Sequence, residues 1–151
     1  MKKSEWGNAV WLLFHTLSYK LRHEYSSETV ILFKHIKLIC NNLPCPDCQQ
    51  HAVKILSKSN SNIITASKDS LIQFLFSFHN IVNSHTKHAI FPKELLDIYN
   101  NANTRNVVDN FIKIMSSNMN NNNLMMDSFR RQNYMQTFIA YINNNSFKYD
   151  A

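Results

Sequence analysis

The sequence contains very little glycine and proline. Only one of its 151 residues is glycine and three are proline. Glycine supplies the positive backbone φ angles of tight hairpins and the close backbone approach of phosphate-binding loops, so both features need more of it than this chain has. The scarcity argues against a hairpin-rich barrel and against a glycine-rich nucleotide loop. It favours an all-α fold.

Long apolar runs are also missing. No stretch approaches the roughly 20 apolar residues that a membrane span requires. Met1 is followed by two lysines and then by a polar segment, where a secretory signal would have its apolar core. We therefore expect a cytoplasmic protein without a membrane span. Because 44% of the residues are hydrophobic, the chain has enough apolar side chains for one sizeable core.

The net charge of +6 is not concentrated in any part of the sequence. No basic run is longer than two residues, and no aromatic and basic RNA-binding signature is present. These observations favour a solvated basic surface, and we expect no nucleic-acid partner.

Apolar residues recur at three- and four-residue spacing along most of the chain, which predicts amphipathic helices. We expect helices over 4–24 with Ser4 as the N-cap, over 27–41, from Cys45 to about Lys58, over 67–84, and a short one opened by Pro92. Residues 59–67 are polar and predict a loop. Two more amphipathic segments, 107–115 and 129–142, flank the asparagine run 120–123. We take 1–103 as the chemical core and 104–151 as a helical extension of unknown role.

The three cysteines all fall between positions 40 and 48. Their odd number excludes a framework made only of disulfides. Cys45 and Cys48 form a C-x-x-C pair, and Pro46 between them suits the first turn of a helix. A helix N-terminus favours the thiolate, so we expect a lowered thiol pKa there. Thiolates attack disulfides, and such a pair suits repeated disulfide exchange.

Two other interpretations of the cysteines compete with this one. Cys40, Cys45, Cys48 and His51 would make a Cys3His zinc set, although all four crowd into twelve residues and structural zinc sites usually draw ligands from a distant segment. A zinc-stabilised helical binding module therefore remains the alternative. A thioredoxin is disfavoured because no strand precedes the pair. Cys40 alone is expected to be a small core residue.

Electrons that leave a dithiol need an acceptor, and a flavin is the usual two-electron one. Three segments bear on this point: W-G-N-A-V-W-L-L-F-H at 6–15, L-P-C-P-D-C-Q-Q-H-A at 43–52 and H-N-I-V-N-S-H-T-K at 79–87. In this order they resemble the Erv/ALR family of FAD-linked sulfhydryl oxidases, over roughly residues 4–100. The wording of the second segment is most similar to versions carried by large cytoplasmic DNA viruses such as poxviruses. For a viral chain, the compartment would be the host cytoplasm or the virion.

The resemblance implies a four-helix bundle with a short fifth helix and FAD at one end. Cys45 would exchange with the substrate dithiol, Cys48 would lie next to the flavin, and O2 would take the electrons to give H2O2. The implied cofactor-binding residues are Gly7, Trp11, His15, His51, His79, Asn80, Asn83 and Lys87. The implied partners are a dithiol protein or small thiol relay protein and a second copy of the chain, packed through the early helices.

The sequence departs from the family pattern in its cysteines. Many family members carry a second cysteine pair that shuttles electrons to the first, and this chain has none. The substrate or a relay protein must therefore deliver electrons directly to Cys45. Leu43 stands where cellular members often have tyrosine, which removes one aromatic contact to the cofactor.

Overall fold

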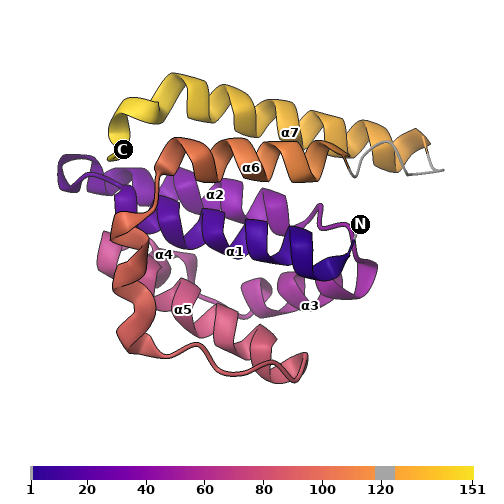
Figure 1. Cartoon of the computed structure of the whole chain (residues 1–151), viewed down its shortest axis with the longest axis horizontal. Helices are drawn as coiled ribbons and strands as arrows, with labels where there is room; N and C mark the ends of the chain where they lie inside the picture. Colours follow the sequence, from indigo (N-terminus) through magenta and orange to yellow (C-terminus); the bar gives the residue numbers. More distant parts are fainter. Residues whose placement is uncertain (1, 118–124) are drawn as a thin grey trace.

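The computed structural model of the protein describes residues 2–117 and 125–151, which form three layers of helices (Figure 1). Helices α1 (Lys3–Lys20) and α2 (Thr29–Cys40) make the middle layer. Helices α3 (Pro46–Ser57) and α5 (Lys68–His85) cover one side of it. Helices α6 (Thr104–Ser117) and α7 (Met125–Asn145) cover the other. The prediction of an all-α fold is confirmed.

Shorter elements connect these helices. They are the 3-10 helices η1 (His23–Glu28), η2 (Lys93–Asn101) and η4 (Ser146–Lys148) and the four-residue helix α4 (Ser61–Ile64). The expected short fifth helix is thus η2, a 3-10 helix that follows Pro92. The polar segment 59–67 is not entirely a loop as predicted. It contains α4 because the Asn60 side chain accepts backbone hydrogen bonds at the helix start and Ile64 is buried.

One hydrophobic core runs through all three layers. A phenylalanine from each of five helices is almost completely buried: Phe14 of α1, Phe33 of α2, Phe78 of α5, Phe111 of α6 and Phe138 of α7. Burial of one such side chain contributes roughly 1.5–3 kcal/mol. The two C-terminal helices therefore share the core of the helices before them. The functional division at residue 103 stays a prediction.

Helix α1 ends at Lys20, four residues before its predicted end. Leu21 turns into extended backbone and forms an isolated antiparallel bridge with Tyr149. The Asp150 N–H donates to the Lys20 carbonyl (2.7 Å), and the Arg22 N–H donates to the Lys148 carbonyl (2.9 Å). Residues 148–150 thus form hydrogen bonds with the backbone groups of Lys20 and Arg22 that a longer helix α1 would use within itself. Sequence periodicity does not reveal this contact.

Helices α3 and α5 begin as predicted. Helix α2 begins at Thr29, two residues after its predicted start, and α6 and α7 begin before the predicted segments 107–115 and 129–142. Helix α1 begins at Lys3, one residue before its predicted start. Its N-cap is Lys2, without a side-chain hydrogen bond, so the prediction of Ser4 as the N-cap is wrong. At α5 the Ser67 Oγ accepts from the Ser70 N–H (3.0 Å) and begins the helix as expected for a serine cap. The asparagine run 120–123 lies outside the described residues.

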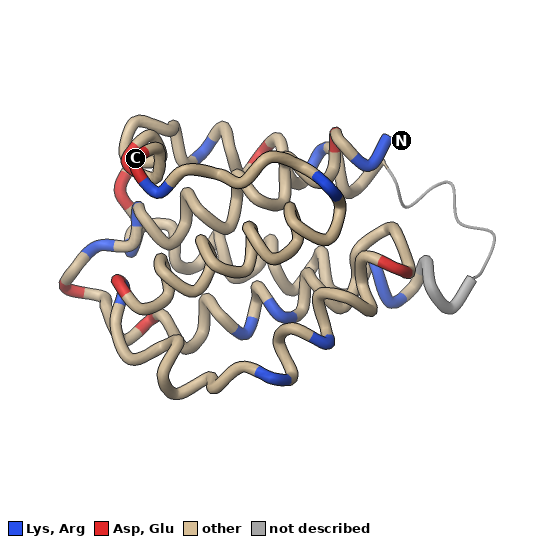
Figure 2. The backbone as a smooth tube through the Cα atoms, turned by 90° about the horizontal axis from the view of Figure 1, so that it is seen from below, with Lys and Arg blue, Asp and Glu red and all other residues tan. Residues whose placement is uncertain are grey.

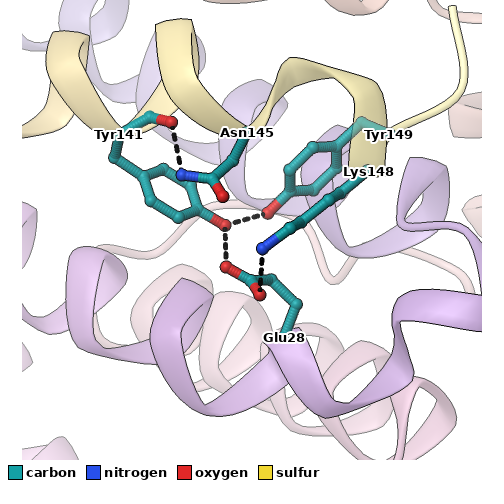
Figure 3. A network of polar contacts seen from close by, with 5 residues as sticks. All are labelled: Glu28, Tyr141, Asn145, Lys148 and Tyr149. Carbon is teal, nitrogen blue, oxygen red and sulfur yellow. Dashed lines mark hydrogen bonds and ion pairs between the residues drawn. The ribbon is translucent and has the colours of Figure 1, made fainter.

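A buried polar network fixes α7 and η4 onto η1 (Figure 3). Glu28 is only 7% exposed, and its carboxylate accepts from the Lys148 ammonium (2.8 Å) and from the Tyr141 hydroxyl (3.1 Å). The Tyr141 and Tyr149 hydroxyls are hydrogen-bonded to each other at 2.6 Å. Burial raises the pKa of both tyrosines. A buried carboxylate needs such partners, so the network fixes the position of the C-terminal helices.

Candidate active site

The C-x-x-C pair occupies the start of α3, as the sequence predicts. Cys45 is the N-cap, Pro46 is the first helical residue, and the Cys45 Sγ accepts a hydrogen bond from the Cys48 N–H at 3.3 Å. Both sulfurs are partly buried, and both cysteines are free thiols in this structure. The Cys45 sulfur, at the N-cap, lies against the positive end of the helix dipole, where negative charge on it is stabilised.

The Cys48 thiol differs from the expectation for a helix start. Its pKa is raised, first because it is partly buried and next because it is hydrogen-bonded to Cys45. Lys3 acts in the opposite direction and favours the thiolate. The expectation of a lowered pKa is therefore wrong for Cys48, because desolvation outweighs the helix end and the lysine.

A cavity adjoins Cys48 between α1, α3 and α5. Its empty volume is about 680 Å³, part of which is open to solvent. Four of the predicted catalytic and cofactor-binding residues line it: Gly7 and Trp11 of α1, and Cys48 and His51 of α3. The structure therefore brings the first two sequence segments together at one site. The third segment is represented in the wall by Val82 and His85 of α5 and by Thr86, which follows the helix.

Sequence reasoning missed several residues of this wall. His85 is exposed, yet it also belongs to the wall, because it lies three residues after Val82 and seven after Phe78 on the same helix face. That spacing was a usable signal. Cys40 also lines the cavity while 1% exposed, and burial raises the pKa of its thiol to about 12.

His15 and His79 lie together behind Trp11 and outside the cavity wall. The two imidazoles share a hydrogen bond of 3.0 Å between Nε2 of His15 and Nδ1 of His79. The Trp11 indole stacks on His79 with ring centres 4.2 Å apart and planes 11° from parallel. Burial, with a contribution from His79, lowers the pKa of His15 to about 3, and burial lowers that of His79 to about 4. Both rings are therefore neutral at neutral pH.

The remaining predicted cofactor residues lie further along the chain. Asn80 makes two hydrogen bonds with the backbone of Phe91, donating to its carbonyl (3.1 Å) and accepting from its N–H (2.8 Å). Asn83 donates to the Asn80 side chain (3.4 Å). Lys87 is exposed in a turn with a φ of 62°. Neither Asn83 nor Lys87 belongs to the cavity wall.

A second, shallower hollow continues from the first. Asn80, His51 and His85 contribute to its lining, and the last two also line the main cavity. The imidazoles of His51 and His85 are in contact, with ring centres 4.1 Å apart. The two hollows therefore meet at this histidine pair, and an elongated ligand could occupy both.

The lining fits a flavin. Most of the surface of the main cavity is contributed by aromatic and aliphatic side chains, among them Trp11, Phe14 and Phe78. A planar apolar ring system suits such walls, and the Cys48 thiol and the His51 imidazole are the polar groups that would contact it.

The zinc alternative is not supported. Within residues 2–117 and 125–151, no group of three or more His, Cys, Asp or Glu side chains is arranged to hold a metal ion. Three of the four residues of the proposed set, Cys40, Cys48 and His51, line the same cavity but do not form such a group. Cys40 is buried in the core, Cys45 caps α3, and the His51 ring packs on His85.

The model of the Erv1 / Alr family matches residues 8–105 of the chain, which is about two thirds of its length. The chain therefore belongs to the Erv1 / Alr family, as the sequence segments predicted.

Several curated relatives of the chain are named FAD-linked sulfhydryl oxidases. A putative FAD-linked sulfhydryl oxidase of Invertebrate iridescent virus 3 is 31% identical over 80 residues, which cover 52% of this chain and 54% of the relative. A probable FAD-linked sulfhydryl oxidase of Fowlpox virus is 28% identical over 93 residues, covering 62% and 87%. An FAD-linked sulfhydryl oxidase of Oryza sativa is 30% identical over 93 residues, covering 61% and 47%. The chain thus spans about half the length of the iridovirus relative. No solved structure matches the chain.

Two observations concern a membrane span and a nucleic-acid partner. Among the described helices, none is long and apolar enough to cross a membrane. Lys and Arg are distributed over several elements of the chain (Figure 2). The expectation of no nucleic-acid partner stays a prediction.

Proposed function

We propose that the protein is an FAD-dependent sulfhydryl oxidase that forms disulfides in protein substrates. Electrons pass from a substrate dithiol through Cys45 and Cys48 to FAD and then to O2, which becomes H2O2. One observation carries the proposal: Cys48 of the C-x-x-C pair lies in the wall of an aromatic cavity shared with Gly7, Trp11 and His51. Membership of the Erv1 / Alr family and the names of the matched relatives support it.

The exchange step is assigned to Cys45 because Cys48 lines the cavity and Cys45 does not. A substrate thiolate attacks the Cys45 sulfur, the Cys45–Cys48 bond breaks, and Cys48 leaves with the electron pair and takes up a proton. The second substrate thiol then attacks the mixed disulfide, releasing the oxidised substrate and the reduced Cys45. Two electrons and two protons have moved from the substrate to the enzyme pair. The Cys48 N–H and the helix end stabilise negative charge on the Cys45 sulfur as it leaves.

Bound FAD would supply a two-electron acceptor that reduces O2 to H2O2. Two features of the site control the protonation of the Cys48 thiol. Partial burial keeps the thiol protonated at rest, and Lys3 in the cavity wall favours loss of that proton. The ring system would be held by Gly7, Trp11 and His51. Asn80, in the second hollow, would contact the rest of the cofactor. His15, His79, Asn83 and Lys87 stay proposed as cofactor residues, the two imidazoles through their stack behind Trp11.

Partners and compartment are proposed from the same premises. Cys40 is buried, so a dithiol protein or a small thiol relay protein would deliver electrons directly to Cys45. A homodimer stays a prediction. Because α6 packs along α1 and α7 contacts α2, a partner subunit would need another face of these helices. Residues 1–103 are proposed as the oxidase core, with the cytoplasm, or a virion for a viral chain, as the compartment.

The test is a turnover assay on the purified protein. We expect a flavin absorption band, with O2 consumed and H2O2 formed when dithiothreitol is added. Cys45→Ser should retain the flavin band and lose turnover. A folded protein without flavin that consumes no O2 after incubation with FAD would refute the proposal.

A further inference from the structure

Two imidazoles, His15 of α1 and His79 of α5, lie side by side at the edge of the cofactor cavity. The Trp11 indole, which belongs to the cavity wall, stacks on the His79 ring. Thr86, at the C-terminal end of α5, also belongs to this wall and lies two turns after His79 on the same side of the helix. His79 is therefore next to the cavity, whereas His15 lies behind it with no exposed surface.

The hydrogen bond between the two rings allows only two arrangements of their protons. It joins Nε2 of His15 to Nδ1 of His79 at 3.0 Å. A neutral imidazole has one N–H donor and one bare nitrogen that accepts. In a neutral pair, either His15 donates its Nε2–H to His79, or His79 donates its Nδ1–H to His15.

The second ring nitrogen of His15 decides between these arrangements. Nδ1 of His15 is buried and has no hydrogen-bond partner among residues 2–117 and 125–151. If His79 were the donor, the proton of His15 would be on this Nδ1, as a buried N–H without an acceptor. In folded proteins, orphaned buried donors are rarer than acceptors that lack a partner. The shared bond is therefore formed by the Nε2–H of His15, and the bare Nδ1 of His79 accepts it.

This arrangement leaves the proton of His79 on its other nitrogen, Nε2. His79 is only partly buried, and its Nε2 has no hydrogen-bond partner in the part of the chain that the structure describes. The Trp11 stack and the bond from His15 both hold the ring, so the Nε2–H keeps a fixed direction. A donor that is held in place before a ligand arrives loses little freedom on binding. Such a donor at the edge of the cavity suits a ligand with an acceptor atom.

We propose that His15 is a positioning residue, which donates its Nε2–H to His79 and so makes the Nε2–H of His79 available to a hydrogen-bond acceptor of the bound cofactor. The inference rests on the proposed function, which identifies the cofactor as FAD. Adenine nitrogens and the ribose and phosphate oxygens of FAD are acceptors of this kind. The two histidines thus have different roles, because His79 would contact FAD and His15 would act only through His79.

The first test locates the protons by nitrogen-15 NMR of the full chain loaded with FAD, since protonated and bare ring nitrogens of histidine differ widely in chemical shift. At pH 7.5 we expect both rings to carry their proton on Nε2 and to have a bare Nδ1. A proton on Nδ1 of His79 overturns the inference.

The second test separates the donor of His15 from the volume that its ring fills. Glutamine places an amide N–H close to the position of the Nε2–H, whereas leucine is of similar size and has no donor. The dissociation constant of FAD, measured by fluorescence titration, should rise about tenfold in His15→Leu, as expected for the loss of one oriented hydrogen bond. In His15→Gln it should stay within about threefold of the wild-type value.

Equal losses of FAD affinity in the two variants overturn the inference, because they would show that the His15 ring only fills space. If His15→Leu does not fold, the nitrogen shifts of the wild type still decide the position of the protons. A folded wild-type protein that binds no FAD refutes the proposed function instead.

Discussion

The neutral His15–His79 pair makes the stability of the site sensitive to acid. The His15 side chain has no exposed surface, and its pKa falls from an ordinary 6.5 to about 3. In the unfolded chain this imidazole takes up a proton as pH falls through 6.5, whereas the folded chain keeps it neutral. The unfolded state therefore binds more protons, and the stability contributed by the neutral ring is complete above pH 6.5 and is lost as pH falls toward 3.

The size of the loss follows from the interval between the ordinary pKa and the working pH. Each pH unit below the unfolded pKa costs about 1.4 kcal/mol until the folded pKa is reached. Lowering the pH to about 5 should thus cost about 2 kcal/mol through His15 alone. His79 acts in the same direction, but its partial exposure to solvent makes its contribution smaller.

Urea unfolding of the wild type and of His15→Phe at pH 7.5 and pH 5, with the same excess of FAD throughout, measures this effect. Phenylalanine fills the site but does not titrate, so the free energy of unfolding of the variant should fall less between the two pH values, by about 2 kcal/mol. Groups common to both proteins cancel in this difference, apart from His79, whose hydrogen-bond partner is replaced. Equal pH dependence in wild type and His15→Phe would refute the reasoning.

Two more predictions concern the cavity lysine and the C-terminal helices. Lys3→Ala should move the alkaline rise in the rate of flavin reduction by dithiothreitol to higher pH, because Lys3 lowers the pKa of the Cys48 thiol. Rapid-mixing pH profiles test this, and Lys2→Ala at a neighbouring exposed lysine should not shift the profile. Phe111→Ala should destabilise the fold by about 3–5 kcal/mol in urea unfolding, since this α6 side chain has no exposed surface. Phe129→Ala, at a 73% exposed position of α7, should cost far less, and similar losses would show that α6 does not share the core.

The helices were predictable because their signal is local. Apolar spacing and the serine and proline at helix starts are visible within a dozen residues, and Ser67 and Pro46 lie at helix starts as expected. The early end of α1 was not predictable. It depends on backbone bonds to Asp150 and Lys148, more than a hundred residues away in sequence.

The site was predictable in part for the same reason. The motifs identified Trp11 and Cys48, and folding places both in one cavity wall. Cys40 belongs to that wall through the packing of helices and not through any motif. The raised pKa of Cys48 likewise depends on how far tertiary packing buries the first turn of α3. Helix propensity and motif spacing contain no information about that burial.

The central claim is that Cys48 passes electrons from the redox pair to a flavin in the adjoining cavity. Its most direct test is anaerobic mixing of the FAD-loaded protein with excess dithiothreitol while the flavin absorption band is followed. The account predicts that the band bleaches in the wild type and returns when O2 is admitted. In Cys48→Ser with FAD still bound, it should stay unbleached on the same time scale. Bleaching of the Cys48→Ser protein at the wild-type rate would contradict the account.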